Sequence, residues 1–209
     1  MGYLYFRVDQ EAMKRKIQDI AASRADVQAM ATSVVANLFE RAHGSLMKDF
    51  LQHKITEEIK NGGGAANISN TLNGKGNLFA FLGFFAGQDP TLDLQALLQN
   101  ISFHKTSQSR GVIRFVIDNI PTEDAIKDAS RMTWGSASWA LAMEDGDFQG
   151  GADLAHFMFK DWEKARSLSG FQVKGGGLTG GEFSPKRYMS EILENFENRI
   201  NNSRSKFIA

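Results

Sequence analysis

The chain of 209 residues contains no cysteine. This absence excludes disulfide bonds, thiolate nucleophiles and zinc sites that depend on cysteine. The chain also lacks an excess of charge of either sign, because 24 lysines and arginines balance 24 aspartates and glutamates. Proteins dedicated to binding DNA or RNA normally carry a basic surplus. We therefore expect weak or no binding of nucleic acid.

Long hydrophobic runs are missing as well. The aromatic-rich stretch "NLFAFLGFFAG", residues 77–87, is short and interrupted by glycine. A helix that crosses a bilayer needs about 20 apolar residues. The first residues, "MGYLYFRVDQ", show no basic start followed by a long apolar run, so we expect no secretory signal. The sequence predicts no membrane partner.

Signatures of catalysis are also missing. The stretch Gly74-Lys75-Gly76 does not fit the phosphate-binding pattern GxxxxGK[ST], because glycine follows the lysine. No GxSxG sequence marks a serine nucleophile, and no histidine lies in a metal-binding HExxH spacing. The four histidines are His43, His53, His104 and His156. The sequence therefore predicts no cofactor and no enzymatic activity.

One acidic cluster keeps a metal site open as an alternative. The stretch "EDGDFQGGAD" contains Glu144, Asp145, Asp147 and Asp153. Hard cations favour several carboxylates around one loop. The spacing does not match an EF-hand, so a solvated turn is the simpler interpretation. A metal-dependent hydrolase that uses these four carboxylates is the alternative from another functional class.

Residues 9–60 have the clearest helical pattern. Asp9 is a candidate N-cap, and from Asp26 onward apolar residues recur at spacings of three and four, which predicts a long amphipathic helix with Gly44 as a candidate interruption. Residues 61–77, "NGGGAANISNTLNGKGN", are turn-forming almost throughout and predict an exposed loop. The aromatic-rich stretch that follows favours a buried strand over a helix.

The middle of the chain alternates predicted strands and short helices. A helix with Leu92, Leu97 and Leu98 inward precedes a β-hairpin formed by "ISFHKTS" and "GVIRFVIDNI". Pro121 opens a further helix at its first position. The stretch "TWGSASWALAMEDG", residues 133–146, predicts another strand.

A second glycine-rich loop, residues 174–184, precedes a final helix, residues 185–203, for which Ser184 is the candidate cap. The order is long helices, then a sheet-containing core over residues 78–173, then the closing helix. This order predicts a single α+β domain with a mostly antiparallel sheet and short helices.

Four pieces of sequence, taken in order, carry a resemblance. They are "GKGNL" at residues 74–78, the strand-like "GVIRFVIDNI", "SWALAMEDG" with Trp139 and the step Glu144-Asp145-Gly146, and "GGEFSPKRYMSEILENF" with Phe183 and Pro185. They resemble the TGNL-like step, β-meander, Glu-x-Gly step and Phe/Pro loop of the neck and tail-completion proteins of tailed bacteriophages, including minor tail and tail-terminator-like proteins. The usual proline-valine-aspartate lead-in is replaced by "NISNTLN".

The resemblance implies a non-enzymatic structural protein of the virion, assembled in the cytoplasm of the bacterial host. It implies a homo-oligomeric ring at the head–tail neck or tail end, in contact with other neck, tail or connector proteins. We expect the two glycine-rich loops to make the contacts between rings. The candidate residues are Gly62, Gly63, Gly64, Asn67, Gly74, Lys75, Gly76, Asn77, Gly175, Gly176, Gly177, Gly180, Gly181 and Phe183.

Two consequences of this hypothesis are specific. Deletion of Gly62 to Asn70 is predicted to leave a folded protomer that fails to join its partner. A ring could also line the exit path of the packaged genome with few basic residues per subunit. A protein that contacts nucleic acid along this path is therefore a further alternative.

Overall fold

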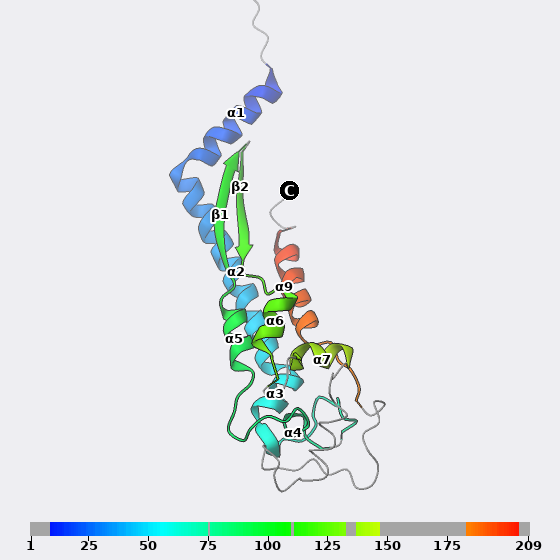
Figure 1. Cartoon of the computed structure of the whole chain (residues 1–209). Coiled ribbons are helices and arrows are strands. Elements are labelled where there is room, and N and C mark those ends of the chain that lie inside the picture. Colours follow the sequence, from blue (N-terminus) through cyan, green and yellow to red (C-terminus); the bar gives the residue numbers. More distant parts are fainter. Residues whose placement is uncertain (1–8, 75, 110, 133–136, 147–182, 205–209) are drawn as a thin grey trace, which may run out of the picture.

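A computed structural model describes residues 9–74, 76–109, 111–132, 137–146 and 183–204. Within these ranges, helices and one two-stranded antiparallel sheet form an α+β fold, which confirms the predicted class. In Figure 1, helices α1 and α2 form a long arm, and strands β1 and β2 lie along it. Helices α3 and α4 lie at the end of the molecule opposite to α1.

The helical arm comprises α1 (Gln10–Ser23) and α2 (Ala25–Gln52). Asp9 caps α1 as predicted, because its Oδ1 accepts hydrogen bonds from two backbone N–H groups of the first turn. Arg24 has an extended backbone and forms an elbow between the two helices. Helix α2 passes through Gly44 without a break, so the apolar pattern outweighs the low helix propensity of glycine.

A second elbow, at His53, leads into α3 (Lys54–Lys60). The Nδ1 atom of His53 accepts a hydrogen bond from the backbone N–H of Ile55 at 3.3 Å and so caps α3. A 3-10 turn, η1 (Gly62–Gly64), follows. Helices α1, α2 and α3 therefore lie within the region 9–60 that was predicted to be helical.

The predicted hairpin is confirmed as β1 (Ser102–Ser109) and β2 (Val112–Asp118). Alternate residues of β2 are exposed and half-buried, as expected of a strand with one covered face. On the covered face, Phe103 packs against Phe39 of α2 with ring centroids 5.0 Å apart, and against Phe115 at 6.2 Å. The hairpin is thus held against the arm by aromatic contacts.

The aromatic-rich stretch after Asn77 is not a strand, contrary to the prediction. It forms the short helix α4 (Leu78–Phe81), followed by a turn. The side chain of Asn77 accepts a hydrogen bond from the backbone N–H of Ala80 at 2.8 Å, and this cap starts a helix despite the aromatic content. The expected burial of the large side chains is confirmed for Leu78, Phe79, Leu82 and Phe84.

The strand predicted for residues 133–146 is also wrong where the structure describes it. Residues 139–145 form helix α7 (Trp139–Asp145). The Oγ atom of Ser138 accepts a hydrogen bond from the backbone N–H of Leu141 at 3.1 Å. This N-cap favours a helix over the predicted strand, as Asn77 does at α4. Trp139 is fully buried and packs edge-on against Phe84.

The helix α5 (Leu92–Gln99) buries Leu94 and Leu98. Leu97 is half-buried. Leu92 is 55% exposed, so its predicted inward orientation is wrong. The leucine at the start of this helix lies on a different face from the two that reach the core.

Two predicted helix starts are shifted. Helix α6 (Glu123–Ala129) begins after Thr122, whose Oγ1 accepts a hydrogen bond from Ala125, and Pro121 lies outside the helix. Helix α9 (Met189–Arg204) begins later than residue 185, and Ser184 does not cap it. In both places hydrogen bonds to other segments or a better cap set the boundary.

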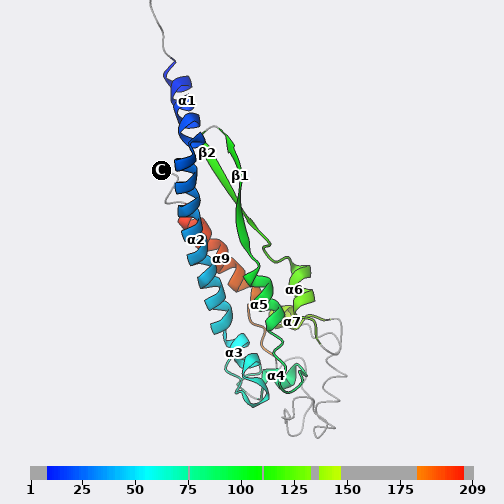
Figure 2. The ribbon, with the colours of Figure 1, turned by 90° about the vertical axis from the view of Figure 1, so that its left-hand side faces the viewer.

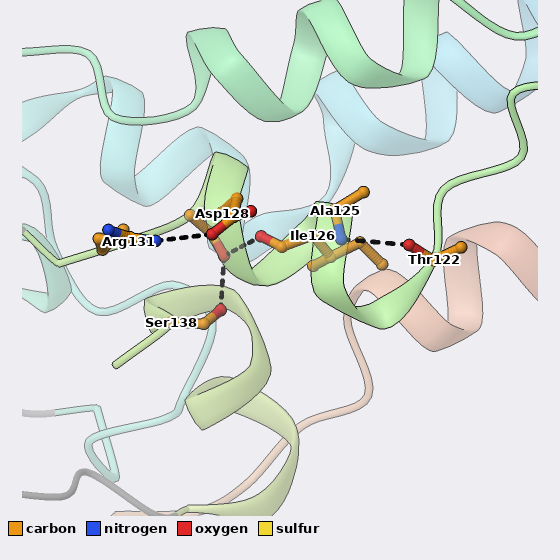
Figure 3. A network of polar contacts seen from close by, with 7 residues as sticks. Thr122, Ala125, Ile126, Asp128, Arg131 and Ser138 are labelled. Carbon is orange, nitrogen blue, oxygen red and sulfur yellow. Dashed lines mark hydrogen bonds and ion pairs between the residues drawn. The ribbon is translucent and has the colours of Figure 1, made fainter. Parts of the chain in front are cut away.

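Short polar contacts join α6 to α7 (Figure 3). Ser130 Oγ donates to the carbonyl of Ile126 at 2.6 Å and pairs with Ser138 Oγ at 2.5 Å. The backbone N–H of Trp139 donates to the carbonyl of Ser130 at 2.8 Å. Because Ser138 is also the cap of α7, this pair fixes where α7 starts relative to the end of α6.

The core lies where α2, α3, α4, α5, α7 and α9 meet. Its largest fully buried side chains include Trp139, Tyr188, Phe50, Phe79 and Phe84. In Figure 2 the arm runs along the left of the molecule, and the hairpin and helices α5, α6 and α7 lie to the right of it. Among the described residues, no helix has the length and apolar character to cross a membrane.

Candidate interaction site

The first glycine-rich loop lies at the end of the molecule opposite to α1 (Figure 1), and the described residues that end the second loop, Phe183 and Ser184, contact this region. We call this region the loop end; it comprises residues 61–74 and 76–78 together with residues 183–186. The backbone N–H of Ser184 donates to the carbonyl of Thr71 at 2.7 Å. Phe183 stacks on Phe81 with ring centroids 5.9 Å apart and an interplanar angle of 10°.

The carboxylate of Glu58, on α3, organises the first loop. Glu58 is fully buried. Its Oε1 accepts a hydrogen bond from the backbone N–H of Leu78 at 2.8 Å, and its Oε2 accepts from the backbone N–H and the hydroxyl of Ser69 at 3.1 and 2.7 Å. A buried carboxylate is costly unless such bonds satisfy it. The loop therefore closes over this side chain.

Asn67 connects Glu58 to the second half of the loop. Its Nδ2 donates to both carboxylate oxygens of Glu58, at 3.0 and 3.1 Å. Its Oδ1 accepts hydrogen bonds from the backbone N–H groups of Leu72 at 2.9 Å and Gly74 at 3.2 Å. Asn67 is 7% exposed, so this candidate contact residue is internal to the protomer.

Asn77 closes the other end of the loop. Besides capping α4, it donates from Nδ2 to the carbonyls of Gly62 and Ala65. The prediction of an exposed loop is wrong for much of residues 61–77. The buried residues there are Asn67, Ser69, Thr71, Leu72 and Asn77. Deletion of Gly62 to Asn70 would take two partners from Glu58, so we expect it to unfold the protomer, contrary to the prediction from sequence.

The other candidate contact residues are distributed as follows. Gly64, Gly74 and Gly76 are exposed, whereas Gly62, Gly63 and Phe183 are half-buried. Lys75, Gly175, Gly176, Gly177, Gly180 and Gly181 lie outside the described residues. The exposed candidates of the loop end are therefore the three glycines Gly64, Gly74 and Gly76. Asn67 and Asn77 make hydrogen bonds inside the protomer.

Glu144, from the proposed acidic cluster, has a structural role. Its Oε1 accepts hydrogen bonds from the backbone N–H groups of Tyr188 at 3.2 Å and Ser190 at 2.8 Å, at the start of α9. A carboxylate is favourable there because the helix N-terminus has unsatisfied N–H groups. Asp147 and Asp153 lie outside the described residues. In the described part of the chain, no three histidine or acidic side chains are grouped as a metal site.

Gly146 ends α7 and lets the chain from the second loop approach closely. Its φ is 74°, in the left-handed region, and its N–H donates to the carbonyl of Ala142 at 3.0 Å. A Cβ at this position would lie 3.1 Å from Cγ of Pro185. The Glu-x-Gly step and the Phe/Pro loop, both used in the resemblance, are therefore in contact.

Tyr188 links α9 to α3 in the core beside the loop end. Its hydroxyl is hydrogen-bonded to Thr56 Oγ1 at 2.8 Å, and its ring packs on His53 at 4.9 Å. Burial raises the pKa of Tyr188 and lowers the pKa of His53, because the charged form of each would lose solvation.

An apolar stripe on α1 is exposed. Met13, Ile17 and Ile20 are 50, 59 and 58% exposed and lie on one helix face, at spacings of four and three. The tip of the hairpin contacts a different face, because a Cβ at Gly111 would lie 2.7 Å from Cβ of Gln18. We call the first three residues the α1 stripe.

Comparisons with protein-family models, with curated proteins and with solved structures find no match for this chain. The resemblance to phage neck proteins rests on the order of its motifs and stays a prediction.

Glu58 is not among the residues predicted from the sequence. A signal was present, because Glu58 is three residues after Ile55 and one before Ile59, on the inward face of a helix. A charged residue at such a position needs partners. What the sequence could not show is that these partners come from the loop.

Proposed function

We propose that this chain is a structural protein of a tailed bacteriophage that forms a homo-oligomeric ring at the head–tail neck or tail end. A tail-completion or tail-terminator role is the specific form of this proposal. Two kinds of observation support it: the contact between two of the motifs that carry the resemblance, and the exposed apolar surfaces of α1 and the hairpin.

Two of the motifs that resemble the phage family are in contact although they are far apart in the chain. Leu78, from the GKGNL step, is bonded to Glu58. Glu144 holds the start of α9, and Gly146 lies against Pro185. The contact between the Glu-x-Gly step and the Phe/Pro loop is the structural observation that supports the resemblance.

The α1 stripe carries the proposal of assembly. A protein that works as a monomer rarely keeps large apolar side chains of one helix face in water, since their burial is favourable by about 25 cal/mol per Å². Met13, Ile17 and Ile20 are each at least half exposed. A neighbouring protomer would remove them from water.

The hairpin offers a second apolar surface. Val112 and Val116 of β2 are 49 and 45% exposed, on the face turned away from the half-buried Ile113 and Phe115. A contact between the α1 stripe of one copy and the outer face of the next copy's hairpin joins two different surfaces. Contacts of this heterologous kind generate rings when their rotation closes.

The test is to determine the mass of the purified full chain by light scattering and its shape by electron microscopy, and to label intact phage particles with an antibody against it. We expect rings of several protomers and label at the head–tail junction or tail end. Ile17→Asp should abolish the rings without a change in melting temperature, whereas Arg15→Gln, on another face of α1, should preserve them. Absence of label at these positions, or rings that survive Ile17→Asp, would contradict the proposal.

A further inference from the structure

The first half of α2 carries a second exposed strip, separate from the α1 stripe. Its members are spaced by four, four, three and four residues, so they follow one face of the helix. We call it the outer strip: Asp26, Met30, Val34, Asn37 and Arg41. All five are exposed, Met30 by 70% and Val34 by 37%. They lie on the side of α2 opposite to the core residues Ala42, Leu46 and Phe50.

The outer strip has the chemistry of a protein contact. Residues 27–39 of α2 contain no charged side chain, although Ala29, Met30, Thr32, Ser33, Val34 and Asn37 are all exposed. A helix face that stays in water normally carries charged residues, and depletion of charge is typical of the centre of an interface. Charges return at the two ends of the strip, with opposite signs, as Asp26 and Arg41. Arg24 of the same chain already donates to both carboxylate oxygens of Asp26, at 3.0 and 2.7 Å, on the exposed surface, and the carboxylate keeps further acceptor sites for a second guanidinium.

The order of the strip makes it complementary to itself. Asp26 and Arg41 are equally distant along the helix from the midpoint between Ser33 and Val34, and so are Met30 and Asn37. Two copies that pair antiparallel about a two-fold axis at this midpoint bring each Asp26 beside the Arg41 of the other copy. A parallel pair would instead place like charges together at both ends. We infer that the free protein forms a two-fold dimer through its outer strips.

This dimer is independent of the proposed ring. It uses the face of α2 and requires neither the α1 stripe nor the hairpin. A two-fold contact joins the same surface of both copies and closes on itself. Failure of the dimer would therefore leave the ring proposal unchanged, and failure of the ring would leave the dimer.

The absence of cysteine provides a direct test by cross-linking. In Ser33→Cys the only thiols of the dimer lie next to the two-fold axis, and mild oxidation should convert most of the protein to a disulfide-linked dimer. Lys48→Cys is the matched control, since it is exposed on the same side of α2. At about 1.5 Å per residue, its two copies would be roughly 40 Å apart. It should not cross-link. Equal cross-linking of both variants, or none in Ser33→Cys, overturns the inference.

A charge exchange tests the pairing itself. Asp26→Arg and Arg41→Asp each place two like-charged pairs in the dimer, and each should raise the dissociation constant measured by sedimentation equilibrium by roughly tenfold. The variant with both substitutions restores opposite charges and should dimerise within about threefold of the unsubstituted chain. These measurements are made in the Ile17→Asp background, in which the ring contact is removed. A double variant that is no better than the single ones overturns the inference.

Discussion

The loop end and the helical arm differ in whether their polar and apolar side chains find partners within the chain. At the loop end, a buried carboxylate, two asparagines and the start of α9 are bonded to segments distant in sequence. Along α1, the only buried residue is Ala22, and three large apolar side chains stay exposed. The described polar groups of the loop end are bonded within one chain, whereas α1 leaves three large apolar side chains in water.

This difference has a consequence for stability. Local opening has a low free energy where few apolar groups are buried, and a high one where the core and its hydrogen bonds must break together. Substitutions at the loop end should therefore change the free energy of unfolding, and substitutions on α1 should change assembly. Four experiments test this separation, from the largest expected effect on stability to the smallest.

Glu58→Ala should have the largest effect. It leaves the buried donors of Asn67, Ser69 and Leu78 without their acceptor. We expect a loss of about 3–5 kcal/mol in the free energy of unfolding, measured by urea denaturation. Glu57→Ala, at the exposed neighbouring position, should change it by no more than about 0.5 kcal/mol. Similar losses for both variants would contradict the role assigned to the Glu58 carboxylate.

Gly146→Ala should come next, with Gly87→Ala as its matched control. Both glycines have positive φ, 74° and 82°, so both variants incur the left-handed strain of about 1–2 kcal/mol. Only at position 146 would the new Cβ meet another group, Cγ of Pro185 at 3.1 Å. We expect about 1 kcal/mol more destabilisation in Gly146→Ala. Equal urea midpoints would show that Pro185 moves away from the new Cβ without a loss in the free energy of unfolding.

Tyr188→Phe isolates one hydrogen bond of the core beside the loop end. Loss of the bond to Thr56 should lower the free energy of unfolding by about 1–2 kcal/mol at neutral pH. Burial raises the pKa of Tyr188, so the folded state holds this proton more tightly than the unfolded state. The resulting stability is present below the unfolded pKa of about 10 and is lost as pH rises above it.

The check on Tyr188 is a series of urea midpoints between pH 8 and pH 11. The midpoint of the unsubstituted protein should fall more steeply above pH 10 than that of Tyr188→Phe. Parallel curves for the two proteins would mean that the hydroxyl titrates as readily in the folded as in the unfolded state.

The sequence predicted the elements whose signal is local. The 3.6-residue periodicity of α2 and the alternation in β2 both follow from residues close together in the chain. The two wrong strands have a common cause. Asn77 and Ser138 cap helices, and a single capping bond outweighed an aromatic composition typical of strands.

The candidate site was predicted only in part. Two glycine-rich loops were recognised, but the exposure of the first, residues 61–77, was overestimated because turn-forming residues such as Asn67 and Thr71 also make good buried partners. The acceptor that buries them, Glu58, belongs to another segment. Hydrogen bonds between segments depend on the tertiary arrangement, which composition and spacing do not contain.

Removal of residues 1–23 should have the smallest effect on stability and the largest on assembly. Helix α1 buries only Ala22 and contacts the hairpin tip near Gln18, so we expect a change of no more than about 1 kcal/mol in the free energy of unfolding. The rings should be lost with the α1 stripe, whereas the Ser33→Cys cross-link should persist because α2 is intact. Removal of residues 1–8 alone is the control and should change neither. If the truncated chain unfolds, α1 contributes to the stability of the protomer as the loop end does, which would contradict the separation.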